Sequence, residues 1–592
     1  MALSFYQRPM NAQINEIRLL ELTKGSSSDP VSCSMRLVSL DDADIEYEAL
    51  SYVWGTVAGH VPIQVCGESF EATSNLELAL RHLRYKDRSR LLWVDAVCIN
   101  QMDIPERNSQ VKLMGSIYET AHQVVVWLGE EESDTMEIIE LIHRMAGNHE
   151  FHWADFTPIE DYEPRPELGV DRLLLFMFFR KPWWTRMWTL QEMAKAKSLT
   201  FICGSHVISG KTFELLVQSF YIHYQVCCFP ENNNPILTLP HLENRFLELQ
   251  RIENLRKSRT RVGFLELARL YRYRIATDPH DMVYGLLGMS LDLDDKVINY
   301  QLPVAEAYEL ATLALIAKTG NLDVFSHVLE HPSDASHEHT ENLPSWVPDW
   351  KLEYKFEVLR FSGKRQEAFS THKTSGSIPV DINRVSPGKI AIKGLLFDTV
   401  EELAHAKAPS ILISYESIDE WREFAGVDEK PEEPYAGGKT LIDAFWRTLC
   451  CDMSVIRGEK RATFKDRILH DEWWWIFLLM KYEQNAQGQL KKLRQEELRG
   501  VNQLALSIYS YTAGRRFFRT KTGYIGVGPS GMKEGDQVCV LFGGKTPFIL
   551  RRKDPEAKVH NKSVEEWIFV GDAYVQGIMN GEAIKSMENE QL

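Results

Sequence analysis

The sequence predicts an α/β protein with a mostly parallel sheet in its first part, a mainly helical middle and a small β-rich end. Its three predicted domains span residues 37–205, 206–440 and 441–592. Strand-like and helix-like segments alternate through the first 204 residues, which is typical of a parallel sheet covered by helices. Helical periodicity dominates residues 211–320, and strand-like runs gather after residue 523, with Gly543 and Gly544 as a hairpin turn.

Four apolar, strand-like runs and one hairpin define the sheet of the first domain. The predicted strands are residues 48–54, 91–99, 122–128 and 199–203, and the hairpin is residues 62–73. The first three runs need cover on both faces because they are almost wholly apolar. We therefore expect them to be neighbouring or near-neighbouring strands of one sheet.

Helices are predicted between these strands. Ser74 is placed to cap the first of them. Pro105 opens the next one at its first position, where a missing N–H costs nothing. Further helices are predicted at residues 134–145, 171–179 and 184–196, and an exposed proline-rich loop at residues 157–166.

The later part of the chain changes character twice. Strand-like alternation returns at residues 386–397, and a charged helical region follows at residues 443–511. The predicted strands of the last domain are residues 523–527, 537–542, 547–551 and 567–570. We expect them to form a small sheet or barrel.

The composition argues against several classes of protein. A chain of 592 residues exceeds what one hydrophobic core usually serves, so at least two packed units are expected. A formal net charge of −16 disfavours broad contact with nucleic-acid phosphates. The longest apolar run, residues 173–179, is far shorter than the roughly 20 residues of a membrane span, and no signal pattern opens the chain.

Cysteine usage indicates the compartment. The nine cysteines contain no CxxC pair and form no regular framework, as expected where thiols stay reduced. We therefore expect a folded intracellular protein located in the cytoplasm.

Three sequence blocks carry a resemblance to a known family. They are YEALSYVWG at 47–55, LWVDAVCINQ at 92–101 continuing as ERNSQVKLMGSIYETAHQVVVWLG at 106–129, and RMWTLQE at 186–192. Their order and spacing resemble the signature blocks of the fungal heterokaryon incompatibility (HET) domain. ATDPHDMVYGLLGM at 276–289 and LPSWVPDW at 343–350 resemble segments that usually accompany this domain. The resemblance implies a role in allorecognition, innate immunity and programmed cell death.

The HET domain is in turn distantly similar to TIR domains, which implies a TIR-like or flavodoxin-like sheet. LSYVWG resembles the first TIR strand with its following loop, and VDAVCINQ takes the place of the acidic strand end. WTLQE resembles the TIR motif WCxxE, with Thr189 where those domains have cysteine. Because the glutamate of that motif is catalytic in NAD-cleaving members, the resemblance implies that Glu192 is the catalytic residue.

The chemistry of such a site needs few groups. Cleavage of the N-glycosidic bond of NAD passes through an oxocarbenium-like ribose, which a nearby carboxylate stabilises. Nicotinamide is a good leaving group, so we expect neither a metal nor a resident cofactor, with NAD or a related nucleotide as substrate. Candidate substrate-binding residues lie at strand ends or beside the glutamate: Ser51, Tyr52, Trp54, Gly55, Asp95, Asn100 and Trp188.

Each candidate also has a structural interpretation. Glu192 could pair with Arg186 or Lys195 on a helix surface, and Asp95 could cap the turn after its strand. The tryptophans could be core or interface residues. The alternative function is a non-catalytic adaptor that self-associates through the strand-end loops, with aromatic anchors. An open pocket at Glu192 would favour catalysis, whereas a carboxylate buried in a dry core would favour the adaptor.

The remaining expectation concerns control. All blocks with a chemical interpretation precede residue 205, so we expect the later part of the chain to regulate the first domain, in response to a protein trigger that the sequence does not identify. This hypothesis predicts that residues 1–210 alone are at least as toxic, or as active on NAD, as the full chain.

Overall fold

The protein folds into two compact units, residues 1–302 and residues 303–592. The computed structural model describes residues 3–42, 44–55, 59–147, 166–226, 240–329, 339–352, 356–406, 415–454, 461–482, 504–505, 507–554 and 565–590. The predicted loop at 157–166 lies outside these ranges except for its last residue. Within these ranges, the helices are all too short or too polar to cross a membrane.

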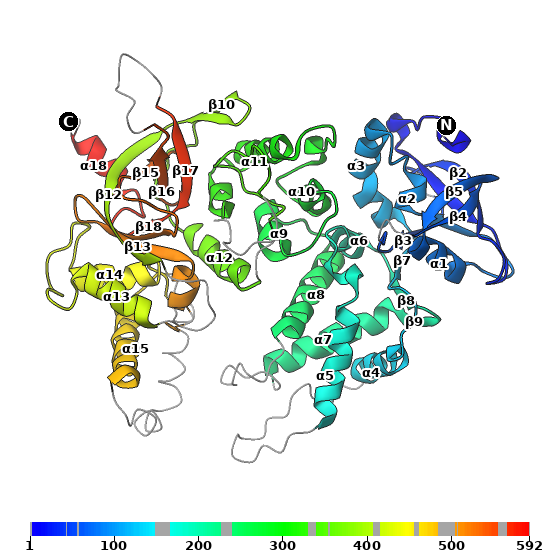
Figure 1. The fold of residues 1–592 in the computed structure, drawn as a ribbon, viewed down its shortest axis with the longest axis horizontal. Helices are drawn as coiled ribbons and strands as arrows, with labels where there is room; N and C mark the ends of the chain where they lie inside the picture. Colours follow the sequence, from blue (N-terminus) through cyan, green and yellow to red (C-terminus); the bar gives the residue numbers. More distant parts are fainter. Residues whose placement is uncertain are drawn as a thin grey trace. The chain divides into compact units, whose positions relative to one another are not determined.

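The first unit is built on a nine-stranded mixed sheet (Figure 1). Its strands are β1 (Glu16–Leu22), β2 (Ser32–Ser39), β3 (Glu48–Ser51), β4 (His60–Val65), β5 (Glu68–Thr73), β6 (Arg90–Trp93), β7 (Gln123–Trp127), β8 (Leu199–Cys203) and β9 (His206–Ser209). Their order across the sheet is β5-β4-β2-β1-β6-β3-β7-β8-β9. The adjacent strands β6, β3, β7 and β8 are parallel, as predicted.

The flanks of this sheet depart from the predicted parallel arrangement. Antiparallel pairs join β1 to β2 and β6, β4 to β5, and β8 to β9, so the sheet as a whole is mixed. The connections explain this difference: a tight turn at Cys66 and Gly67, both with positive φ, can join only antiparallel strands. The predicted hairpin at 62–73 is thereby confirmed.

The centre of the sheet confirms the predicted neighbours. Strand β3 lies between β6 and β7, with Ala49 paired to Trp93 on one side and to Val124 on the other. Residues 124–127 of β7 are fully buried. Burial on both faces is what a nearly continuous apolar run predicts for a central strand.

The described part of the first unit also contains ten α-helices (Figure 1). They are α1 (Ser74–Leu83), α2 (Asp95–Cys98), α3 (Ile104–Thr120), α4 (Thr135–Gly147), α5 (Pro166–Phe179), α6 (Thr189–Lys195), α7 (Gly210–Val226), α8 (Pro240–Ser258) and α9 (Phe264–Tyr271), with α10 (Asp281–Leu287) following α9. The helical prediction for the middle of the chain is thus confirmed for residues that belong to the first unit.

Two helix starts and one strand end differ from the prediction. Helix α1 is capped by Thr73, whose hydroxyl accepts from the Leu76 N–H, so Ser74 is its first residue and not its cap. The run at 91–99 is a strand only as far as Trp93, because the chain then turns into α2. Pro105 is the second residue of α3, whose cap is Asp103.

The predicted helix at 184–196 is also divided. A 3-10 turn, η4 (Pro182–Thr185), precedes α6, and residues 186–188 join the two. This break places α6 at the edge of the sheet where β3 and β6 end, which is where the candidate site lies.

The second unit combines helices with a seven-stranded antiparallel sheet. Its helices are α11 (Val304–Thr319), α12 (Phe356–Phe369), α13 (Tyr415–Ala425), α14 (Leu441–Leu449), α15 (Phe464–Tyr482) and α18 (Glu582–Glu590). A separate hairpin consists of β10 (Ile382–Ser386) and β11 (Lys389–Ile392). The main sheet consists of β12 (Gly394–Ala406), β13 (Arg515–Thr520), β14 (Ile525–Pro529), β15 (Gln537–Leu541), β16 (Phe548–Arg552), β17 (Trp567–Asp572) and β18 (Tyr574–Val575).

The predicted small β-rich end is confirmed, but its sheet recruits an earlier strand. The order is β17-β16-β15-β12-β13-β14-β18, which puts β12 in the middle. Sequence reasoning recognised strand character near residues 386–397 without linking it to this sheet. Gly543 and Gly544 form the turn between β15 and β16 as predicted, and Gly543 has a positive φ.

Candidate functional site

A buried polar cluster forms where the carboxyl end of β3 meets α6. The Ser51 hydroxyl, on the last residue of β3, donates to Oε2 of Glu192 on α6. The indole Nε1 of Trp183, in the preceding 3-10 turn, donates to Ser51 Oγ at 2.7 Å. The side chains of residues 141 positions apart in sequence therefore meet at the edge where open α/β sheets hold ligands.

The environment of Glu192 changes its proton affinity. Glu192 is only 5% exposed, and this burial raises the pKa of its carboxyl to about 7. The Ser51 hydrogen bond and the Arg186 cation act in the opposite direction, whereas Asp95 adds to the rise. A carboxyl with a pKa near neutrality can both give and take a proton at physiological pH.

Asp95 brings the second sequence block into the cluster. It is the first residue of α2, just after β6, and its carboxylate accepts from Trp54 Nε1 at 2.8 Å. Burial raises the pKa of Asp95, against the lowering effect of Arg186 and of its hydrogen bonds. The carboxylate also accepts from the Ala96 N–H at 2.7 Å, so it braces the start of α2 as well.

Arg186 is the cation of the cluster. Its Nη1 donates to the carbonyl oxygen of Tyr52, next to the end of β3. Its charge lowers the pKa of both Glu192 and Asp95, so it stands close to the two acids. The arrangement places one guanidinium among two carboxyl groups in a largely buried site, where electrostatic interactions are stronger than in water.

The other predicted site residues lie differently. Gly55 is exposed and has a positive φ, beside Asn75. Asn100 lies in the loop between α2 and α3: its N–H donates to Glu106 Oε1, and its side-chain oxygen accepts from the Met102 N–H. These two residues shape loops around the cluster.

Trp188 occupies the position just before α6 and turns toward α10. It contributes a hydrogen bond that lowers the pKa of Asp281, which burial raises to about 6. The hydroxyl of Tyr300 also donates to Asp281. The indole expected to flank a substrate beside Glu192 thus has a partner on another helix.

Trp183 and Tyr118 were missed by sequence reasoning. Trp183 hydrogen-bonds to Ser51, and Tyr118, on α3, interacts with Glu192 through its hydroxyl group. Burial and the Glu192 charge raise the pKa of Tyr118 well above its usual range. The only signal for Trp183 was the KPWW run before RMW, and Tyr118 looked like one more apolar-stripe residue of its helix.

The described cluster is closed. Ser51, Trp183 and Glu192 are each at most 5% exposed, so the carboxyl faces packed side chains. Across the described ranges, His, Cys, Asp and Glu side chains do not gather into any group of three that could hold a metal ion.

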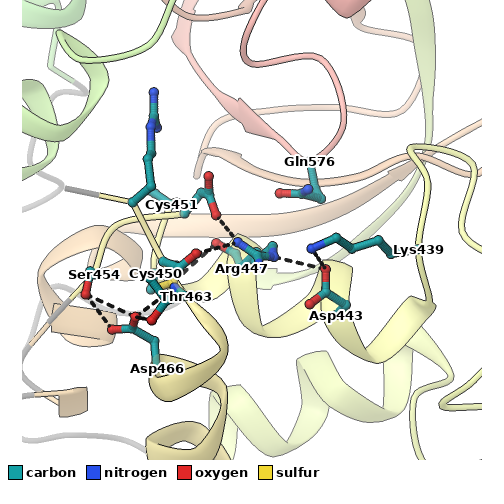
Figure 2. Close-up of polar contacts among 12 residues, drawn as sticks. Lys439, Asp443, Arg447, Cys450, Cys451, Ser454, Thr463, Asp466 and Gln576 are labelled. Carbon is teal, nitrogen blue, oxygen red and sulfur yellow. Dashed lines mark hydrogen bonds and ion pairs between the residues drawn. The ribbon is translucent and has the colours of Figure 1, made fainter. Parts of the chain in front are cut away.

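The second unit contains another polar cluster, around Arg447 on α14 (Figure 2). Arg447 pairs with Asp443 at 2.9 Å and with Asp452. Burial raises the pKa of both neighbouring thiols, Cys450 and Cys451. Paired charges and protonated thiols indicate a bracing role for this cluster, not a nucleophilic one.

Comparison with known proteins was consistent with the sequence blocks. The family described as "Heterokaryon incompatibility protein (HET)" matches residues 47–192, and the family described as "Het-6 beta-barrel domain" matches residues 461–592. The protein "Heterokaryon incompatibility protein 6, OR allele" of Neurospora crassa is 25% identical to this chain, across 97% of this chain and 95% of that relative. No solved structure matches the chain.

Proposed function

We propose that this protein is an effector of the cell death that follows fusion of genetically different cells. The family matches and the Neurospora crassa relative support its assignment as a fungal heterokaryon incompatibility protein. One observation carries the proposal. Residues from the first, second and third blocks of the matched region, 47–192, meet in one buried polar cluster. Residues that are far apart in sequence but meet in one polar cluster are expected when they form a single functional site.

We propose further that this site hydrolyses the N-glycosidic bond of NAD, with Glu192 as the carboxylate beside the ribose. In its charged form Glu192 would stabilise the oxocarbenium-like transition state. Its pKa of about 7 leaves a substantial charged fraction at neutral pH, and Arg186 favours that form. Because the carboxyl is buried and hydrogen-bonded to Ser51, the side chains packed around it must move before a nucleotide can enter.

A non-catalytic adaptor is the second candidate, and the closed cluster favours it. In this function Glu192 is a structural residue held by Ser51, and the protein signals by self-association through the strand-end loops. Trp54, which is half-buried, would then serve as an interface anchor. A protein trigger would control the assembly.

Nicotinamide release separates the two functions. Purified full-length protein is incubated with NAD, and wild type is compared with Glu192→Gln, which keeps the shape of the side chain and removes its charge. Catalysis predicts that the variant loses about a hundredfold or more of the rate. Glu137→Gln is the matched control, because Glu137 is exposed on α4 of the same unit, and its rate should equal that of wild type.

Cell death in a fungal host completes the test. If Glu192→Gln still triggers death as wild type does, and neither protein releases nicotinamide, NAD hydrolysis is wrong and the adaptor is supported. Loss of both activities in Glu192→Gln, with Glu137→Gln unaffected, supports catalysis.

A further inference from the structure

Residues that follow much later in the sequence make hydrogen bonds to the segment that carries Trp183 and Glu192. Arg274, which is 2% exposed, donates through Nη1 to the carbonyl oxygen of Arg186 at 2.8 Å and to Thr189 Oγ1 at 2.7 Å. These two acceptors are the residue just after η4 and the first residue of α6. One guanidinium therefore joins the turn to the first residue of the helix.

Glu248, on α8, holds Arg274 in place. Its Oε1 accepts from Arg274 Nε at 3.0 Å, and its Oε2 accepts from Arg245 Nη1 at 2.7 Å. Burial alone would raise the pKa of Glu248, but the two cations hold it below its usual range. Arg245 in turn donates to the carbonyl oxygen of Trp184 at 3.0 Å. The buried charges are thus mutually paired while both arginines reach the same turn.

The backbone at Ile275 completes this arrangement. Its N–H donates to the carbonyl oxygen of Thr185 at 2.7 Å, and its carbonyl oxygen accepts from the Met187 N–H at 2.9 Å. Together with the arginine contacts, these bonds hold one backbone group of each consecutive residue from Trp184 to Met187. We call Arg245, Glu248, Arg274 and Ile275 the clamp.

The opposite side of the same segment makes the site. Trp183 donates to Ser51, Arg186 donates to the Tyr52 carbonyl oxygen, and Glu192 accepts from Ser51. A shift of the turn would move all three contacts, because hydrogen bonds are sensitive to displacements of a few tenths of an ångström. The clamp lies after residue 192, outside both matched ranges.

We infer that Arg274 is a positioning residue for the Glu192 site: it holds the Trp183–Glu192 segment so that the Glu192 carboxyl stays on Ser51, closed to solvent. The inference deepens the proposed function, on which the importance of this site rests. It also predicts that a change behind the turn opens the site without touching any site residue.

The test measures the accessibility of Glu192 directly. Full-length protein is treated with a water-soluble carbodiimide and an amine, and carboxyl labelling is mapped by peptide mass spectrometry, with buried Glu16 as the internal reference. In Arg274→Met, labelling of Glu192 relative to Glu16 should rise about tenfold or more, because two hydrogen bonds from a charged donor are lost. Carboxyl labelling does not depend on enzymatic activity. The test of Arg274 therefore remains valid even if the Glu192→Gln experiment shows that NAD is not the substrate.

Arg256→Met is the matched control. Arg256 pairs with Glu253 on the same helix, and Glu253 is 3% exposed. Its loss should lower the Tm as Arg274→Met does while leaving Glu192 labelling at the wild-type rate. Equal Glu192 labelling in the two variants, or an unchanged rate in Arg274→Met, would overturn the inference.

Two further variants keep the inference testable if Arg274→Met does not fold. The double variant Glu248→Gln/Arg274→Met removes both members of the ion pair, so neither charge remains buried without its partner. Arg274→Lys keeps the charge beside Glu248 but cannot reach both acceptors with one fork, so Glu192 labelling should be intermediate. Wild-type labelling of Glu192 in both variants contradicts the inference as well.

Discussion

At the residue scale, the cluster around Glu192 shows how burial changes the chemistry of an ordinary side chain. Desolvation is the largest influence on its carboxyl, and the Ser51 hydroxyl and the Arg186 cation offset only part of it. The result is a pKa of about 7 in place of 4.5. The folded protein thus holds a proton on Glu192 at a pH where the unfolded chain has released it.

This proton makes the stability of the first unit depend on pH. The contribution of Glu192 is fully present below its unfolded pKa of 4.5 and is lost as the pH rises through about 7. Glu192→Gln removes the penalty for the buried charge while keeping an acceptor for Ser51. Relative to wild type, the variant should therefore gain unfolding free energy, on the order of 2 kcal/mol, between about pH 5 and about pH 8.

Thermal unfolding of the full chain at several pH values checks this prediction. The Tm difference between Glu192→Gln and wild type should become more positive as the pH rises, and Glu137→Gln should show no such trend. A difference that is constant with pH would mean that Glu192 is ionised throughout this range.

At the element scale, α6 is packed between the site and α10. The carboxamide of Gln191 accepts from the Gly288 N–H at 3.0 Å, while the next residue, Glu192, accepts from Ser51. A Cβ on Gly288 would lie 2.2 Å from Gln191 Oε1, and a Cβ on Gly285 would lie 2.8 Å from Met187 Cγ. Glycine at these two positions is what allows α10 to approach α6 so closely.

Gly288→Ala should therefore destabilise the first unit through steric overlap. Gly288 has an ordinary helical φ, so the cost comes from displacing buried Gln191 and not from backbone strain. We expect a loss of about 1–3 kcal/mol in the free energy of unfolding. Chemical denaturation followed by far-UV circular dichroism measures it.

Gly147→Ala is the matched control for this substitution. A Cβ at Gly147, at the end of α4, would meet nothing within 4 Å. That variant should be neutral or slightly stabilised, because alanine restricts the unfolded chain. If Gly288→Ala lost no more stability than Gly147→Ala, the contact with Gln191 would not carry the expected cost.

At the scale of the whole molecule, the compact first unit extends to residue 302. The clamp residues Arg245, Glu248 and Arg274 lie within it, beyond the boundary at residue 210 that the sequence suggested for an active fragment. A fragment of residues 1–210 lacks these residues and also α8, which packs against α5, α6 and α7. The fragment that tests regulation is therefore residues 1–302.

Expression of three chains tests whether the second unit restrains the first. If it does, residues 1–302 should be at least as toxic, or as active on NAD, as the full chain. Residues 1–210 should be poorly soluble and should unfold at lower temperature than residues 1–302. A folded but inert 1–302 fragment beside an active full chain would mean that the second unit contributes to the activity.

The sequence by itself determined the central strands and the three blocks. Strands β3, β6, β7 and β8 were predicted because short apolar runs rich in β-branched residues are typical of buried strands, and such runs can be recognised from neighbouring residues alone. Ser51 and Asp95 were candidates because strand ends place polar side chains at one edge of the sheet, whereas Glu192 was a candidate because WTLQE resembles a TIR motif. The strands and strand ends depend on neighbours in sequence or on general rules of α/β topology.

Only the tertiary structure decided the protonation of Glu192 and the hydrogen bonds from Arg274 to the segment that carries Glu192. The Glu192 carboxyl is buried beside Ser51 of another element, and Ser51 is in turn hydrogen-bonded to Trp183 of a third. The Arg274 contact with the Arg186 carbonyl oxygen joins residues 88 positions apart. A single sequence has no periodicity that reports such pairings, because the energy of a buried charge is set by whichever groups the fold packs around it.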